Sequence, residues 1–433
     1  MVAIPVAKAT DGYFAHGFGA INKSMGGAGV ALPLDGLSPS NNPAGLAFLD
    51  TRLDVGVTLF NPDRGYTADP VPPAVCGGQA VPPCVPGTEP ITSGTFDSDN
   101  ELFAIPSFGF TWRLSERDAI GFALGANGGL NTEYDRPVFV NFGPRDEQGN
   151  PIPGTPFSAT EPTGADLQQI FIGATYARRL SERHALGITP ILLVQSFEVE
   201  GLEPFKAVSV DPDNVTNNGA DTALGVGVQV GYLGQFTDWL SVGVSYRTEL
   251  ASQDFEDYSG LLAGGGEFNA PAVLLAGIGL RPTPTLRIAL DYKRIFYSEV
   301  AALGNANDVP LDPQNPSLGT DDGLGFGWED MDIFKIGAEW DVTPVWTLRA
   351  GFSHGEQPVP GAQALFNILA PAVIEDHVTV GVGRRFGSKH QLNAFYMHAF
   401  EETVEGTNPN TGPQTGSIRM FQNEVGLSYT RFF

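Results

Sequence analysis

The feature that most constrains the fold of this chain is a run of alternating apolar and small or polar residues that recurs along the sequence. One run has its apolar positions at Leu224, Val226, Val228, Val230 and Tyr232. A period of two places apolar side chains on one face of a β-strand. The runs extend beyond the roughly five or six residues of an ordinary strand. The sequence therefore predicts an all-β fold with long strands.

The connections between the runs alternate in length. Short polar turns join the runs in pairs, at 113–118, 179–184, 236–239, 281–285, 341–346 and 386–390. Long segments rich in Gly, Pro, Asp and Asn separate the pairs. Aromatic residues lie near the run ends, at Trp112, Tyr176, Tyr232, Trp239, Tyr246, Tyr292, Trp340 and Trp346. This combination is typical of a transmembrane β-barrel, whose closure satisfies every backbone group within lipid.

The strand count follows from the turns. Six turns join six pairs of strands, one strand near 52–60 opens the barrel, and one near 417–433 closes it, which predicts 14 antiparallel strands within residues 49–433. An even number is expected of a bacterial barrel made of one chain. The last strand ends in Phe433, a terminal aromatic residue that resembles the signal bound by the outer-membrane assembly machinery. We therefore expect this machinery as a partner and the bacterial outer membrane as the location.

The first 48 residues do not fit a strand of the wall. They are rich in Gly and Ala and are interrupted by Pro, so they are too irregular for the wall and too apolar for a flexible tail. We expect residues 10–48 to form a plug, or hatch, inside the barrel. Residues 1–9 contain Ala7-Lys8-Ala9, an A-x-A cleavage pattern. We interpret them as the remnant of a secretory signal peptide, with a plain N-terminal arm as the alternative.

Composition and motifs argue against several other classes of protein. The formal net charge is −25, the opposite sign from a nucleic-acid-binding surface. The sequence has no zinc-ligand spacing, nucleophile elbow, zincin helix or P-loop, so we expect no catalytic residue, metal or cofactor and no enzyme activity. Cys76 and Cys84 lie close together in a segment rich in Pro and Gly. We expect a disulfide between them, with two free thiols as the alternative.

Several motifs resemble one family of transporters. Near the N-terminus they are Gly17-Phe18-Gly19, Met25-Gly26-Gly27-Ala28-Gly29 and Asn41-Asn42-Pro43-Ala44-Gly45-Leu46. These are similar to the start of the FadL/TodX family, outer-membrane transporters of long-chain fatty acids and other hydrophobic compounds. The segment 129–134 (GLNTEY) resembles the end of that family's third strand. The resemblance implies a 14-stranded barrel with an N-terminal hatch, and it maps the hatch motif onto Asn42, Pro43 and Ala44.

The resemblance also implies that ligand leaves sideways into the membrane, through an opening at a kink in the third strand. We place this opening at Asn127, Gly128 and Gly129. Glycines break the pleat and leave backbone groups unpaired, which is how a strand bulges. The alternative is that Gly128 and Gly129 only bend the outer end of the strand.

The parity of the strands assigns side chains to the lumen. If the apolar face meets lipid, Phe395, Met397, Arg247, Lys335 and Arg349 point inward and are candidates for ligand contact. Phe and Met suit an adaptable apolar pocket, and one of the cations suits a carboxylate. The alternatives are packing against the hatch for the apolar pair and ion pairs between neighbouring strands for the cations.

Two kinds of loop segment are also notable. The apolar stretches 261–263 and 365–369 are candidates for collecting ligand from the medium, and the pattern over 361–373 predicts a short amphipathic helix that contains the latter stretch. The acidic clusters 97–101 and 211–213 are either plain solvated loops or sites for divalent cations that bridge to lipopolysaccharide. Lipopolysaccharide and outer-membrane lipid are therefore expected partners.

The sequence thus predicts a monomeric passive transporter that carries hydrophobic small molecules, chiefly long-chain fatty acids, across the outer membrane. One alternative is a channel of the same family for aromatic hydrocarbons or alkanes. Another is a general diffusion porin, which should conduct ions and lack a hatch. More distant alternatives are an outer-membrane enzyme and an adhesion barrel that acts through its loops.

Overall fold

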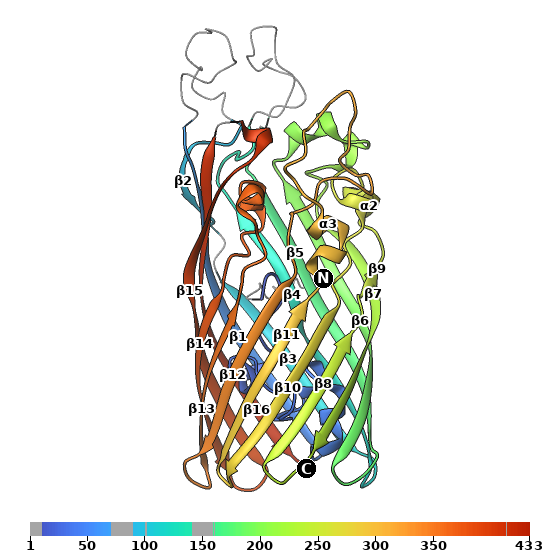
Figure 1. The fold of residues 1–433 in the computed structure, drawn as a ribbon, viewed down its shortest axis with the longest axis vertical. Coiled ribbons are helices and arrows are strands. Elements are labelled where there is room, and N and C mark those ends of the chain that lie inside the picture. Colours follow the sequence, from blue (N-terminus) through green and yellow to red (C-terminus); the bar gives the residue numbers. More distant parts are fainter. Residues whose placement is uncertain (1–10, 71–89, 100–101, 141–158, 160, 413) are drawn as a thin grey trace.

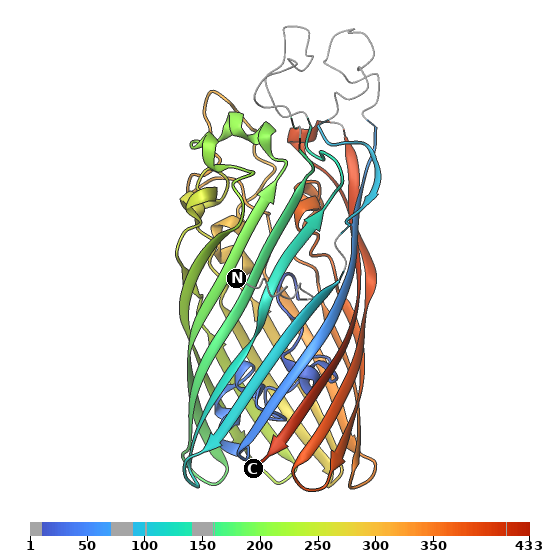
Figure 2. The same ribbon diagram turned by 180° about the vertical axis from the view of Figure 1, so that it is seen from behind.

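The computed structural model describes residues 11–70, 90–99, 102–140, 159, 161–412 and 414–433. Their strands form one antiparallel sheet that closes into a barrel, as the sequence predicts (Figures 1 and 2). The first and last strands pair from Arg52 opposite Phe432 to Ala68 opposite Gly416. The expected signal remnant at 1–9 and the expected disulfide between Cys76 and Cys84 lie outside the described residues.

Fourteen strands form the wall, which confirms the predicted number. They are β1 (Arg52–Ala68), β3 (Phe103–Arg113), β4 (Asp118–Glu133), β5 (Gly164–Arg179), β6 (His184–Glu200), β7 (Asp221–Gln235), β8 (Leu240–Arg247), β10 (Val273–Thr283), β11 (Leu286–Ile295), β12 (Met331–Asp341), β13 (Trp346–Gly355), β14 (Asp376–Phe386), β15 (His390–Thr407) and β16 (Thr415–Phe432). Two short strands, β2 (Gly94–Asp97) and β9 (Ala251–Ser252), add to the edges of β1 and β7. The first strand extends well past the predicted end at residue 60.

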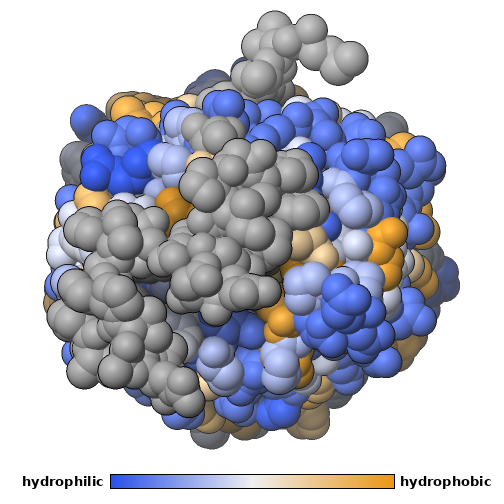
Figure 3. Space-filling model, turned by 90° about the horizontal axis from the view of Figure 1, so that it is seen from above, coloured by the Kyte–Doolittle hydropathy of each residue, from blue (hydrophilic) through white to orange (hydrophobic). Residues whose placement is uncertain are grey.

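The wall alternates as the sequence pattern requires. On β7, Leu224 and Val226 are 50% and 63% exposed, whereas Ala223 and Gln229 are buried. Because lipid is the solvent outside a barrel, the exposed apolar face is the stable outer surface. The six short turns lie together at the lower end in Figure 1, beside the C-terminus, and the long loops gather at the other end. Seen from the loop end, the surface formed by the described residues is mainly hydrophilic, with small hydrophobic patches (Figure 3).

The helical segments are short. The α-helices are α1 (Gly19–Lys23), α2 (Ala263–Gly266) and α3 (Ala301–Gly304), and the 3₁₀ turns are η1 (Ser38–Ser40), η2 (Pro43–Phe48), η4 (Glu203–Val208), η5 (Pro212–Asn214), η6 (Glu256–Tyr258), η7 (Tyr297–Glu299), η8 (Gly361–Gln363), η9 (Phe366–Leu369) and η10 (Pro409–Thr411). Within the described part of the chain, no helix has the length and apolarity needed to span a membrane. The expected amphipathic helix over 361–373 is wrong, because only η8 and η9 form between Pro360 and Pro371.

Residues 11–49 lie inside the barrel, as the dark blue ribbon in both views shows (Figures 1 and 2). Almost all of these residues are buried. Helix α1 contacts β14, β15, β16 and β1, whereas η2 contacts β4, β5, β6 and β7. Charged groups of the wall hold this N-terminal segment. Lys23 pairs with Glu424 at 2.8 Å, and the Asp291 carboxylate accepts the backbone N–H of Gly29 at 2.6 Å.

Candidate ligand path

The hydrogen-bonded wall is interrupted between β3 and β4. These strands pair only from Arg113 opposite Ala119 to Phe108 opposite Leu124. Beyond that point β4 remains paired with β5, but its register shifts between Ala126 and Gly128. Farther out, the backbone N–H of Asp99 donates to the Glu133 carbonyl at 2.8 Å. Backbone hydrogen bonds to β4 therefore resume on both sides of the interruption.

Strand β4 lies behind β3 at this interruption. Ala126 occupies an outward position on β4, yet it is only 7% exposed. It packs in one cluster with Phe60, Phe103 and Ile105, which are buried residues of β1 and β3. The inner face of the neighbouring strands thus covers the outer face of β4. The predicted opening, Asn127 to Gly129, lies on this displaced stretch.

The N-terminal segment takes up the backbone groups that β3 leaves unpaired. The N–H of Ala15 donates to the Asn127 carbonyl at 3.1 Å, and the N–H of Gly129 donates to the Tyr13 carbonyl at 2.9 Å. A Cβ atom at Gly128 would overlap the Tyr13 carbonyl oxygen. Glycine is therefore needed at this position for the two backbones to approach.

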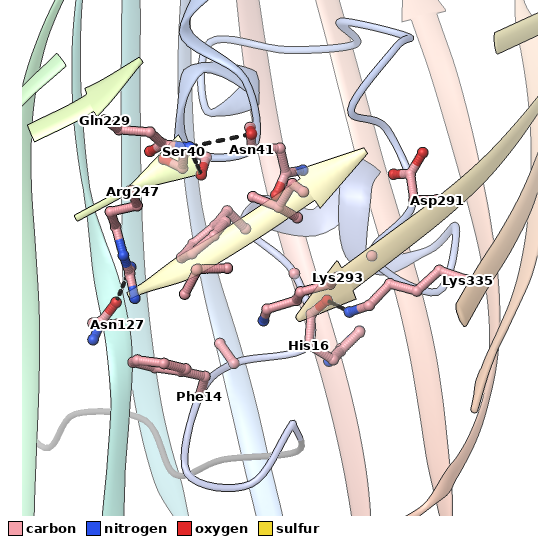
Figure 4. A pocket seen from close by; sticks show the side chains of 16 residues that line it. Phe14, His16, Ser40, Asn41, Asn127, Gln229, Arg247, Asp291, Lys293 and Lys335 are labelled. Atoms are coloured by element: carbon pink, nitrogen blue, oxygen red, sulfur yellow. Dashed lines mark hydrogen bonds between the residues drawn. The ribbon is translucent and has the colours of Figure 1, made fainter. Parts of the chain in front are cut away.

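Arg247 reaches this junction from β8 (Figure 4). Its Nη1 donates to Asn127 Oδ1 at 2.7 Å, and its guanidinium lies 4.8 Å from the ring centre of Phe14. The side chain is 7% exposed, and its Nε has no hydrogen-bond partner among the described residues. No carboxylate of the described chain forms an ion pair with it. Arg247 is thus a buried cation whose hydrogen-bond partners are neutral. A second cation, the Lys293 ammonium, lies 5.6 Å from the centre of the Phe14 ring.

The other candidate cations have carboxylate partners. Lys335 donates to Asp11 at 2.7 Å, and Lys293 donates to the same carboxylate at 2.8 Å. Arg349 donates to Glu339 at 2.6 Å. Lys335 and Arg349 point inward, in agreement with the parity prediction, but both are occupied by structural ion pairs, as is their neighbour Lys293. Arg247 is therefore the candidate cation that is left for a ligand.

The two apolar candidates also point inward. Phe395 is 3% exposed and Met397 is fully buried. The ring of Phe395 faces the Lys23 ammonium at 6.0 Å, so it packs against the N-terminal segment. A ligand contact by either residue stays a prediction.

Loop residues and the loop-side ends of β4, β5 and β6 line an apolar chamber of about 80 Å³. Both apolar loop stretches contribute to it, through Leu261, Leu262, Phe366 and Leu369. Asn307 is the polar side chain among the lining residues, and none of them is charged. This chamber suits an apolar molecule or an alkyl chain.

The acidic cluster at 211–213 serves to join loops. The Asp211 carboxylate accepts hydrogen bonds from Asn214 at 2.7 Å and Ser259 at 2.8 Å, and these bonds lower the pKa of Asp211. In the described ranges, no group of three or more potential metal ligands is found. Cation-mediated binding of lipopolysaccharide at this cluster stays a prediction.

A line of aromatic rings separates the chamber from Arg247. Phe326 lines the chamber, and its ring lies 6.0 Å from that of Trp328. Trp328 contacts Tyr297 at 5.1 Å, and Tyr297 stacks on Phe14 at 5.8 Å. The cavity beside Phe14 and Arg247 measures about 20 Å³, which is room for about one water molecule. A ligand must therefore displace Phe14 or its neighbours to reach Arg247.

The predicted hatch motif lies at the short-turn end of the lumen. Asn42 Oδ1 accepts the N–H of Ala44 at 3.1 Å, and Asn42 Nδ2 donates to the carbonyls of Val30 at 3.0 Å and Tyr232 at 2.9 Å. A Cβ atom at Gly231 would overlap Asn42 Oδ1. The motif thus fixes η2 against β7 at a position that requires glycine.

Comparison with known proteins decides the family. A family model described as "Outer membrane protein transport protein (OMPP1/FadL/TodX)" matches residues 6–426. The chain belongs to this family. It is therefore an outer-membrane β-barrel, and its family consists of transport channels for hydrophobic compounds rather than enzymes. No curated protein sequence matches the chain.

Solved structures of the FadL/TodX type share the fold. A FadL homologue from Pseudomonas aeruginosa has a TM-score of 0.70 at 17% identity, covering 98% of this chain and all of that one. The toluene transporter TodX from Pseudomonas putida has a TM-score of 0.65 at 18% identity, covering 98% and 100%. The toluene transporter TbuX from Ralstonia pickettii has a TM-score of 0.61 at 17% identity, covering 96% and 99%.

Sequence reasoning missed several residues of the junction in this FadL-family chain. Asp11 joins two lysines, and Phe14 joins Arg247 to the aromatic line. Gln169 accepts a hydrogen bond from Asn127 at 2.8 Å. No pattern in the sequence marks Asp11, because its partners Lys293 and Lys335 are distant in the chain and adjacent only after closure.

Proposed function

We propose that this FadL-family chain carries long-chain fatty acids, and that Arg247 binds their carboxylate on the way through the barrel. The observation that supports this proposal is the lack of a carboxylate partner, among the described residues, for a buried arginine beside the wall interruption. An uncompensated buried charge is costly to a protein. A ligand carboxylate would offset this cost through charge-assisted hydrogen bonds to the guanidinium.

The rest of the path suits the alkyl chain of such a molecule. The loop chamber is apolar and uncharged, so the chain of a fatty acid can enter it while the head group remains near water. Movement of Phe14 would then bring the molecule to Arg247. In this scheme residues 10–48 act as the hatch, with Asn42, Pro43 and Ala44 fixing its lower part.

We further propose that the ligand leaves sideways, between β3 and β4. Three observations support this route: the strand pairing stops at Phe108 and Leu124, β4 is displaced inward, and Arg247 binds Asn127 within the displaced stretch. Backbone groups exposed to lipid are costly unless they face protein or a cavity. The N-terminal segment satisfies these groups at rest, and its movement would uncover the opening.

Binding of oleate to the purified barrel tests the head-group assignment. In Arg247→Gln the loss of a charge-assisted contact should lower the oleate affinity by about tenfold to hundredfold, while toluene binding changes little. Arg287→Gln is the matched control, because Arg287 already pairs with Glu339 at 2.8 Å. Equal oleate affinity in the wild type and Arg247→Gln would contradict the proposal.

A channel for neutral hydrocarbons is the second candidate. The uncharged chamber favours it, since toluene needs no cation. This candidate predicts tight toluene binding, weak oleate binding and no effect of Arg247→Gln on either ligand. A general porin is disfavoured because residues 11–49 fill the lumen, and ion conductance in planar bilayers distinguishes it.

A further inference from the structure

The outer wall carries a groove near the short-turn end, remote from the ligand path. It crosses β13, β14, β15, β16 and β1 and has a volume of about 660 Å³. The row of outward residues across it runs from Val382 to Ala394, Leu427 and Val57. Ala394 is the small member of this row. Because its neighbours are larger, the outer surface is hollowed above it.

One end of the groove is basic. Arg384 lines the groove, and its guanidinium lies 5.0 Å from the ring centre of Trp346 and 4.8 Å from that of Phe386. Arg431 points outward two strands away, 5.3 Å from the ring centre of Phe433. Neither arginine forms a side-chain hydrogen bond or ion pair with a described residue. Both guanidinium groups are thus free to bind an anion.

This corner is more basic than most of the chain. The formal net charge of the protein is −25, yet residues 384–391 and 425–433 contain no acid. The turns at 113–118, 179–184, 236–239 and 341–346 each contain at least one, whereas the turn at 281–285 also has none. Arg178, which is exposed near the same end of β5, is paired with Asp118 at 3.1 Å. These two segments carry Arg384, Arg385, Lys389 and Arg431 against the terminal carboxylate of Phe433, so the groove corner has a local positive charge.

We propose that this groove binds one glycerophospholipid of the periplasmic leaflet, with an acyl chain over Ala394 and the phosphate between Arg384 and Arg431. Short turns of outer-membrane barrels face the periplasm, so the basic end lies at the depth of phospholipid head groups. Arginine binds phosphate through charge-assisted hydrogen bonds, and basic pockets beside apolar surface bind lipid head groups. The aromatic rings hold the two guanidinium groups at the interface. The bound lipid would cover the seam where β16 closes on β1.

Lipid retention by the purified barrel tests this proposal. The wild type and the variants are extracted in mild detergent and washed until bulk lipid is removed. Bound phospholipid is then counted by native mass spectrometry and by phosphorus assay. Ala394→Phe fills the groove, and Ala276→Phe is its control, since Ala276 is a partly exposed residue of β10 outside the groove. Arg384→Gln/Arg431→Gln removes the anion site, and Arg178→Gln is its control.

We expect the wild type and both controls to retain about one phospholipid per barrel, and the two groove variants to bind it about tenfold or more weakly. Inorganic phosphate should not displace the lipid, because the acyl chain contributes to binding. Heat-modifiable mobility confirms that each variant is assembled. The proposal is overturned if the wild type loses its lipid as readily as Ala394→Phe. The proposal is also overturned if the wild type is a lipid-free dimer that Ala394→Phe dissociates into monomers. That result would assign the groove to a second copy of the chain.

Discussion

Phe14 and Gly128 form an antiparallel bridge at the one place where the described wall lacks its β3–β4 pairing. The N-terminal segment therefore does two things at once. It fills the lumen, and it supplies the hydrogen bonds that a neighbouring strand would otherwise supply. Any movement of this segment must therefore change the exposure of the interruption in the wall.

Filling the slot between β3 and β4 should block release of ligand. Ala126 packs beneath Phe103 and Ile105, so Ala126→Trp places a large ring in the slot. We expect uptake of labelled oleate by whole cells to fall to the empty-vector level while heat-modifiable mobility shows an assembled barrel. Ile120→Trp is the control, because Ile120 faces lipid on the same strand. Undiminished uptake by Ala126→Trp would exclude the lateral route.

Removing the shared carboxylate should release the start of the N-terminal segment. In Asp11→Asn the ammonium groups of Lys293 and Lys335 remain buried without their partner, a change that costs about 3–5 kcal/mol for a buried pair. The strands of the wall have their own hydrogen bonds, so we expect local loosening rather than unfolding. Single-channel recordings in planar bilayers should show a higher ion conductance.

Asp50→Asn is the control for this experiment. Asp50 pairs with Arg113 at 3.2 Å and is 81% exposed, and an exposed pair contributes only about 0–1 kcal/mol. Its conductance should match that of the wild type. A wild-type conductance in Asp11→Asn would show that the ion pairs do not hold the hatch closed.

The contact between the hatch motif and β7 can be tested separately. Gly231→Ala places a methyl group against Asn42, because the Cβ position at residue 231 overlaps Asn42 Oδ1. Overpacking of this kind costs about 1–3 kcal/mol. We expect faster hydrogen exchange at the backbone of residues 38–48 and unchanged exchange in β7. In Gly225→Ala on the same strand, the nearest atoms are 3.2 Å away, so exchange should stay slow. Equal rates of hydrogen exchange at residues 38–48 in the two variants would mean that the hatch motif does not pack against Gly231.

The barrel itself could be predicted because its determinants are local. Both signals can be recognised from neighbouring residues alone: the period of two on β7 and the short turns, such as those at 113–118 and 236–239. The turns predicted the number of strands, and the period predicted which face of each strand points inward. The same parity placed Lys335 and Arg349 in the lumen. The structure adds that both are paired, which parity cannot show, because the pairing depends on which strands become neighbours.

The junction at β4 could be predicted only in part. The glycines at 128 and 129 indicated a break in the strand, but the displacement of β4 behind β3 depends on contacts with Phe60 and Ile105. These contacts arise from closure of the barrel. The role of Asp11 is likewise set by side chains far away in the sequence. Long-range contacts of this kind have no local signal in one sequence.

Uptake of labelled oleate tests directly whether Arg247 binds the carboxylate of long-chain fatty acids as they pass through the barrel. The chain and its Arg247→Gln variant are expressed in a Gram-negative host that lacks its own fatty-acid transporter, with assembly checked by heat-modifiable mobility. We expect uptake above the empty vector for the wild type and a large loss of uptake in Arg247→Gln at low oleate concentration. No uptake by an assembled wild-type barrel, or equal uptake by the two proteins, would contradict the proposal.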